Sequence, residues 1–147
     1  MSDLRQLYEE VILDHNRNPR NFHKKPGGTN RRARGFNPLC GDEFTINLEV
    51  EDGVIKDAGF EGAGCAISTA SASLMTEALI GKTEAQARAL FEDMHTLLTT
   101  NVDAPEVGKL RVLAGVREYP ARVKCATLAW HTMQAALKSE RETVSTE

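Results

Sequence analysis

The chain has 147 residues, 41% of them hydrophobic and 27% charged, with a formal net charge of −3. These values are ordinary for a folded protein, and the length predicts a single domain over residues 1–147. The negative net charge argues against a strongly basic nucleic-acid binder, and no apolar run reaches the length that spans a membrane. The N-terminal residues lack the features of a secretion signal, so we expect a cytoplasmic protein.

The first expected element is an amphipathic helix from about Asp3 to about His15. The next segment, about residues 16–37, carries only basic charges and contains Pro26-Gly27-Gly28, which predicts an irregular basic loop. A solvated surface is the simplest interpretation of this loop, docking to an acidic partner protein is the second, and nucleic acid is the weakest, because aromatic residues are not interleaved. A third strand near Phe36 is an open alternative.

A β-hairpin is expected after the loop. Phe44–Val50 alternates apolar and polar residues, as a half-buried strand does. Asp52-Gly53 is a strong turn signal, and Val54–Phe60 then returns as a strand that we expect to be antiparallel to the first.

The rest of the chain has helical patterns. One helix is expected to begin near Cys65 and to end with Gly81 as its C-cap. The next begins with a capping box, Thr83 with Gln86, and ends near Thr99. The last expected segments are a short helix within Thr100–Tyr119, a helix from near Val123 to about Lys138, and a frayed tail over residues 139–147. Together these elements predict an α+β fold in which a small antiparallel sheet of about three strands packs against several helices.

Three cysteines and one aspartate are the main candidates for a functional site. Cys40 and Asp42 flank Gly41, so an extended or turning backbone can point both side chains the same way. Cys65 and Cys125 are each expected at the start of a helix, where the partial positive charge favours a thiolate. An odd number of cysteines argues against a disulfide framework. Three thiolates and a carboxylate match a tetrahedral zinc site or the ligands of an iron–sulfur cluster.

Two other interpretations stay open at this point. Any single buried cysteine can be a core residue. A thiol hydrolase would need a base that contacts the nucleophile, but His131 follows Cys125 by six residues and therefore lies on another side of the helix. We therefore expect His131 to be a surface or packing residue.

Four stretches of the sequence resemble the SufU branch of the IscU/NifU-N family, and together they span nearly the whole chain. The stretches are Leu7–His15 with Pro19-Arg20-Asn21, Asn37–Asp42, Phe60–Ser68 and Arg122–Trp130. The resemblance implies an α+β fold of the IscU/SufU type in which the cysteines and Asp42 converge near one end of the sheet. The sequence departs from the IscU branch at Lys124, where scaffolds of that branch carry a histidine.

The resemblance implies a role in iron–sulfur cluster assembly. By analogy with SufU, Zn²⁺ is held by Cys40, Asp42, Cys65 and Cys125, and Cys40 is the catalytic thiolate that accepts persulfide sulfur from a SufS-type cysteine desulfurase. A SufBCD-type scaffold is a candidate second partner. One alternative is a scaffold that assembles a [2Fe–2S] cluster, with iron as the metal. Another is a non-catalytic, zinc-stabilised interaction domain. We expect no membrane or nucleic-acid partner.

Overall fold

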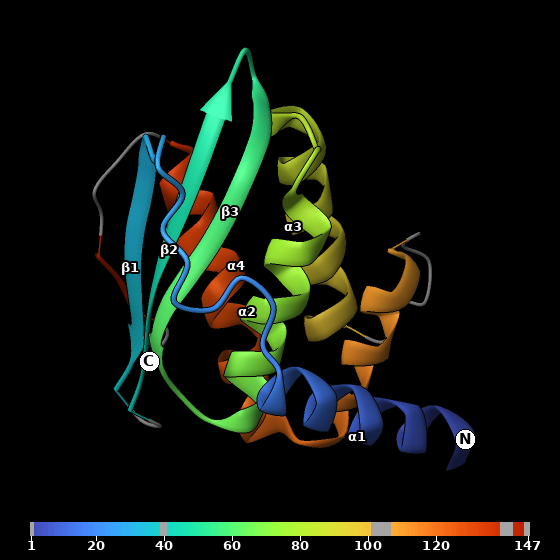
Figure 1. Ribbon diagram of the computed structural model, residues 1–147. Coiled ribbons are helices and arrows are strands. Elements are labelled where there is room, and N and C mark those ends of the chain that lie inside the picture. The colour runs from blue at the N-terminus through green and yellow to red at the C-terminus, as the bar shows by residue number, and fades with distance from the viewer. Residues whose placement is uncertain (1, 39–40, 101–106, 139–142, 146–147) are drawn as a thin grey trace.

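The computed structural model describes residues 2–38, 41–100, 107–138 and 143–145 (Figure 1). Within these residues no helix is both long enough and apolar enough to cross a membrane. The elements follow in the order α1 (Ser2–Arg17), β1 (Arg31–Asn37), β2 (Asp42–Glu51), β3 (Val54–Ala63), α2 (Ala66–Leu79), α3 (Glu84–Thr99), the 3₁₀ segments η1 (Gly108–Glu118) and η2 (Pro120–Arg122), α4 (Val123–Leu137) and β4 (Thr143–Ser145).

The sheet has the strand order β3-β2-β1-β4. The expected hairpin is confirmed, since β2 and β3 pair antiparallel around a turn in which Asp52 and Gly53 have φ values of 54° and 76°. Positive φ at both central residues is the geometry that favours an Asp-Gly sequence. β1 pairs antiparallel with β2 on the other side, with Phe36 opposite Glu43. The third strand that the sequence left open near Phe36 is therefore present.

Two boundaries differ from expectation. The basic loop is shorter than residues 16–37, because α1 continues to Arg17 and Arg31–Asn37 forms β1. Part of the tail is also ordered as a strand: Thr143–Ser145 pairs parallel with β1. Local polarity predicted no structure there, but the hydrogen-bonding edge of β1 supplies partners that the local sequence does not reveal.

The basic loop is largely neutralised within the chain. Four of its cations form ion pairs with acidic residues outside the segment. The pairs are Arg20 with Asp14, Lys24 with Asp57, Arg31 with Glu84, and Arg34 with Glu43. These pairs reduce the positive charge that a docking partner would meet. The structure therefore favours the interpretation of this segment as a solvated surface over a binding site for a polyanion such as nucleic acid.

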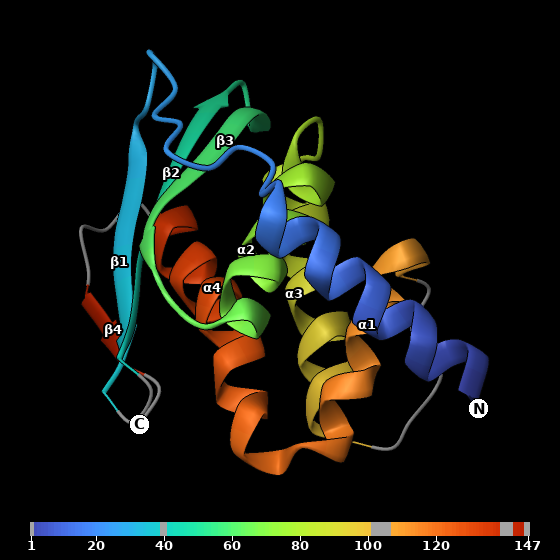
Figure 2. The same cartoon turned by 60° about the horizontal axis from the view of Figure 1, so that its bottom comes forward.

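The helices cover one face of the sheet (Figures 1 and 2). Apolar residues of β2 and β3 point to that face and join the side chains of the helices in one core. The capping box of α3 is confirmed, since Thr83 and Gln86 exchange both hydrogen bonds. The expected C-cap, Gly81, is wrong by one residue: Ile80 is the C-cap of α2, and Gly81 follows it with a φ of 94°.

The packing of α2 against α4 fixes the two helix starts relative to each other. Small residues line the buried face of α2 and let the helices approach closely. The Trp130 ring nitrogen donates a hydrogen bond to Ser71 Oγ at 3.1 Å, and Ser71 Oγ donates to the carbonyl oxygen of Ala126 at 2.6 Å. At the other side of α2, the buried His15 of α1 lies 2.7 Å from Ser73 Oγ through its Nδ1 atom. These buried polar contacts fix the positions of α1, α2 and α4 relative to one another.

Candidate metal centre

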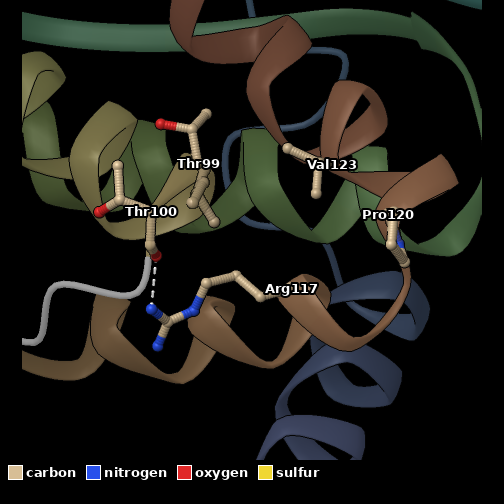
Figure 3. Close-up of a pocket in the computed structure, with 6 residues that line it drawn as sticks. Thr99, Thr100, Arg117, Pro120 and Val123 are labelled. Carbon is tan, nitrogen blue, oxygen red and sulfur yellow. Dashed lines mark hydrogen bonds between the residues drawn. The ribbon is translucent and has the colours of Figure 1, made fainter.

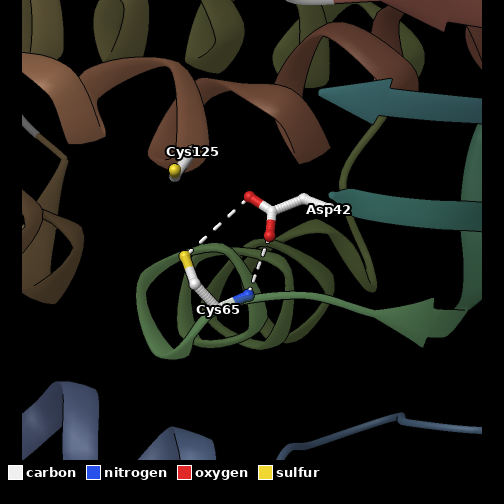
Figure 4. Close-up of side chains that lie close together, drawn as sticks. All are labelled: Asp42, Cys65 and Cys125. Atoms are coloured by element: carbon white, nitrogen blue, oxygen red, sulfur yellow. Dashed lines mark hydrogen bonds between the residues drawn. The ribbon is translucent and has the colours of Figure 1, made fainter. Parts of the chain in front are cut away.

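Three potential metal ligands meet at one end of the sheet (Figure 4). Asp42 is the first residue of β2, Cys65 immediately precedes α2, and Cys125 lies in the first turn of α4. One ligand atom from each of the three lies within 4.8 Å of the others. We call this group the sulfur centre. The fold therefore brings together residues that are up to 83 positions apart in the sequence, as 125 − 42 = 83 shows.

Asp42 is the most constrained residue of the sulfur centre. It is only 1% exposed, and its Oδ1 atom accepts a hydrogen bond from the backbone N–H of Cys65 at 2.8 Å. Its Oδ2 atom lies 3.8 Å from Cys65 Sγ. Among the described residues, no lysine or arginine forms a salt bridge with this carboxylate. A buried carboxylate is costly without a cation, so a metal ion fits this position.

Cys65 is the N-cap of α2. Its Sγ atom accepts a hydrogen bond from the backbone N–H of Ser68 at 3.4 Å and lies 3.5 Å from Ser68 Oγ. An acceptor at this position satisfies an N–H group that the helix itself cannot pair. The expected place of Cys65 at a helix start is confirmed. The contacts with Ser68 hold the Cys65 sulfur beside Asp42, where it can serve as a metal ligand.

Cys125 is the third residue of α4, which confirms its expected place at a helix start. Its side chain is fully buried, whereas the neighbouring Arg122 and Lys124 are exposed. The thiol belongs to the sulfur centre and does not join the continuous apolar core. Burial next to a carboxylate and a second thiol is suited to a shared ion, because two thiolates and a carboxylate are donors that Zn²⁺ accepts.

The fourth predicted ligand, Cys40, lies outside the described residues, and so does Leu39. The flanking residues are described: Pro38 and Gly41 are exposed, and Gly41 has a φ of 74°. Left-handed backbone at this position favours glycine, in agreement with the tight turn that the sequence predicts. The ligand role of Cys40 and its role as sulfur acceptor stay predictions.

The histidines of the described chain do not join the sulfur centre. His131 packs against Phe91 and His95, with ring centres 5.3 and 5.8 Å away. The expectation that His131 is a packing residue is thus confirmed. Burial lowers the pKa of His131, and the nearby His95 lowers it further.

Of two open pockets in the described part of the chain, one includes a residue of the sulfur centre. A pocket of about 330 Å³ is lined by residues around the β1–β2 connection, including Arg34, Asn37 and Asp42. A second pocket of about 320 Å³ lies between the end of α3 and the start of α4 (Figure 3), where Arg117 Nη1 donates a hydrogen bond to the carbonyl oxygen of Thr100 at 2.6 Å. The pocket beside Asp42 is the one that can serve the chemistry of the sulfur centre.

Sequence reasoning did not single out Ser68 or Tyr8. Ser68 contacts Cys65 Sγ through both its N–H and its hydroxyl group. Tyr8 is buried, and burial raises its pKa to about 12. Ser68 could have been found as the residue three positions after an N-cap. For Tyr8 the sequence offers only a helical apolar stripe.

The chain is similar to known proteins over most of its length. The sequence matches the NifU-like N terminal domain family over residues 7–126. The iron–sulfur cluster assembly scaffold protein IscU of Thermotoga maritima is 43% identical over 135 residues, which cover 91% of this chain and 94% of that protein. The zinc-dependent sulfurtransferase SufU of Bacillus subtilis is 38% identical, with 95% of each chain covered.

The fold is shared with solved structures of the same group. The crystal structure of SufU from Fervidobacterium islandicum AW-1, described as an iron–sulfur cluster assembly scaffold protein for the SUF system, superposes with a TM-score of 0.82. That protein is 34% identical, and the alignment covers 90% of this chain and 97% of the other. The chain belongs to the NifU-like N terminal domain family. The resemblance inferred from the motifs is confirmed.

Proposed function

We propose that the protein acts in iron–sulfur cluster assembly as a zinc-dependent sulfurtransferase that accepts persulfide sulfur from a SufS-type cysteine desulfurase. The observation that carries this proposal is the convergence of Asp42, Cys65 and Cys125 within 4.8 Å. The 38% identity to a zinc-dependent sulfurtransferase supports the choice of activity. The recipient expected from the family resemblance is a SufBCD-type scaffold.

Asp42, Cys65 and Cys125 would hold Zn²⁺ together with Cys40. When bound, the ion supplies positive charge that keeps the thiols deprotonated and ties the surrounding segments together. The chain supplies the rest. Asp42 is oriented by the N–H of Cys65, and the N–H of Ser68 supports the Cys65 sulfur. These contacts fix two of the donors before any ion arrives, which lowers the cost of ordering the site.

The sulfur-transfer step is a thiol–disulfide exchange. The Cys40 thiolate attacks the outer sulfur of the desulfurase persulfide, a new S–S bond forms on Cys40, and the S–S bond of the desulfurase breaks. The desulfurase cysteine leaves as a thiolate, so no external oxidant or reductant is needed. The Gly41 backbone beside Cys40 has the left-handed conformation that permits a sharp turn.

A scaffold for a [2Fe–2S] cluster is the second candidate function. The 43% identity to an IscU scaffold protein favours it. The residue before Cys125 argues the other way, because Lys124 is a hydrogen-bond donor without the metal-binding ring nitrogen of a histidine. Anaerobic reconstitution with iron and sulfide separates the two functions. A stable coloured cluster that moves to an apo-acceptor would favour the scaffold.

The sulfurtransferase proposal is tested by locating the transferred sulfur. The zinc-loaded protein is incubated with a SufS-type desulfurase and cysteine, and each cysteine peptide is then alkylated and analysed by mass spectrometry. We expect one extra sulfur atom on the peptide with Cys40, and loss of desulfurase stimulation in Cys40→Ala.

The control is Lys124→Ala, which alters an exposed charge beside Cys125 and leaves all four proposed ligands in place. We expect this variant to keep most of the stimulation. Extra sulfur on Cys65 or Cys125 would show that the acceptor is assigned to the wrong residue. A protein that receives no sulfur and leaves desulfurase turnover unchanged would contradict the sulfurtransferase function.

A further inference from the structure

Three rings form a cluster between α3 and α4, and two of them are imidazoles. Phe91 and His95 lie one turn apart on α3, and His131 lies on α4. The ring centres of His95 and His131 are 5.8 Å apart, and their ring planes stand at 79° to each other. The chain has four histidines in all, so the fold brings half of them together at this one place.

Phe91 contacts both imidazoles and holds them in position. Its ring centre lies 6.1 Å from that of His95, with the two planes at 26°, and 5.3 Å from that of His131, with the planes at 71°. Phe91 itself is 8% exposed and belongs to the core. A fixed ring that contacts both imidazoles limits their rotamers, and such preorganisation lowers the cost of binding a ligand.

The two imidazoles are accessible and have uncommitted ring nitrogens. His95 is exposed and His131 is half-buried. Among the described residues, no hydrogen-bond or ion-pair partner is found for the ring nitrogens of either histidine. His15 differs from them, since it is buried and its Nδ1 atom lies 2.7 Å from Ser73 Oγ. The pair on α3 and α4 can therefore offer its nitrogens to a ligand from solvent.

The spacing of the two rings suits a shared metal ion. Bonds from nitrogen to zinc are about 2.0–2.1 Å long, so two imidazoles on one ion have ring centres about 5–6 Å apart. The observed 5.8 Å lies in this range. Burial lowers the pKa of His131, and His95 lowers it further. His131 is therefore neutral at physiological pH, and a neutral imidazole has the nitrogen lone pair that a metal needs.

We propose that His95 and His131 form a second metal site, which joins α3 to α4 and binds one Zn²⁺ or a similar first-row transition ion that accepts imidazole nitrogen. This site goes beyond the proposed sulfur transfer, because it shares no ligand with the sulfur centre. His131 follows Cys125 by six residues, about 9 Å along α4. Two neutral donors bind zinc more weakly than sulfur donors and a carboxylate together, so the histidine pair fills after the sulfur centre.

The test is a calorimetric titration of the full-length protein that already holds one equivalent of zinc. We expect further Zn²⁺ to bind in a second event with a stoichiometry of one. His95→Gln and His131→Gln should each weaken this event on the order of a hundredfold, because a single donor cannot chelate. His23→Gln is the matched control, since it makes the same change at an exposed histidine that contacts Phe22 and no second histidine. This control should keep the full affinity.

NMR spectra that correlate the ring protons and nitrogens of the histidines identify the ligands directly. We expect the second equivalent of zinc to shift the ring nitrogens of His95 and His131 and to leave those of His15 and His23 unchanged. His95→Gln alters an exposed side chain, so this variant should have the thermal midpoint of the metal-free parent and still lose the second event. The proposal is overturned if no second event occurs, or if that event survives both substitutions.

Discussion

The N-terminal ends of α2 and α4 each present a cysteine to the same carboxylate, but they do so in different surroundings. Cys65 is a half-buried N-cap whose sulfur accepts the N–H of Ser68. Cys125 lies inside the first turn of α4 and is fully buried. Asp42 stands between them, and its Oδ1 atom is held by the N–H of Cys65.

This difference indicates separate tasks for the two thiols. A fully buried sulfur cannot be approached by a partner protein, so Cys125 suits a fixed ligand. The more exposed Cys65 side is where sulfur or a partner can reach the sulfur centre. The backbone contact between Asp42 and Cys65 couples the carboxylate to this accessible side.

The largest effect that we expect is stabilisation by zinc, and it should depend equally on the two cysteines. Metal that binds only the folded state, at a free concentration 1,000 times its Kd, raises the free energy of unfolding by about 4 kcal/mol. If Cys65 and Cys125 ligate one ion, Cys65→Ser and Cys125→Ser should each lose most of that gain. Urea denaturation with zinc and with chelator measures it. Full zinc stabilisation in either variant would remove that cysteine from the ligand set.

Without metal, the same two variants should differ from each other. Serine is a good N-cap, so Cys65→Ser should keep the apo-protein within about 0.5 kcal/mol of the parent. Cys125→Ser places a hydroxyl group at a fully buried position and should cost about 1–3 kcal/mol. Urea denaturation in chelator gives both values. Equal losses would mean that burial does not distinguish the two helix starts.

The sequence predicted the elements that carry the sulfur centre, because their signals are local. The Asp52-Gly53 turn, the Thr83 capping box and the cysteines at helix starts all follow from short-range rules. The pairing of β4 with β1 could not be predicted, since the three residues Thr143–Ser145 have no strong strand pattern and depend on a distant edge.

The geometry within the sulfur centre depends on long-range packing and was only partly predictable. The motifs indicated that Asp42 and the cysteines converge, but a sequence contains no distances. The hydrogen bond from the Cys65 N–H to the Asp42 carboxylate forms because β2 and α2 meet at this end of the sheet. The burial of Tyr8 depends on how α1 packs against η1, which no local pattern encodes.

The smallest effect concerns α4 away from the sulfur centre, and it separates the response of the helix to pH from that of the thiols. The pKa of His131 is lowered from 6.5, first by burial and then by His95. In the unfolded chain His131 regains its ordinary pKa and binds more protons than in the folded protein. The contribution of His131 to the free energy of unfolding is therefore favourable above about pH 6.5 and is lost as the pH falls.

We expect His131→Gln to weaken the fall in stability between about pH 7.5 and pH 5.5, and His95→Gln to weaken it less. Urea denaturation of the metal-free proteins at each pH measures these slopes. Identical slopes in all three proteins would mean that the pH response of the fold comes from groups other than this histidine pair.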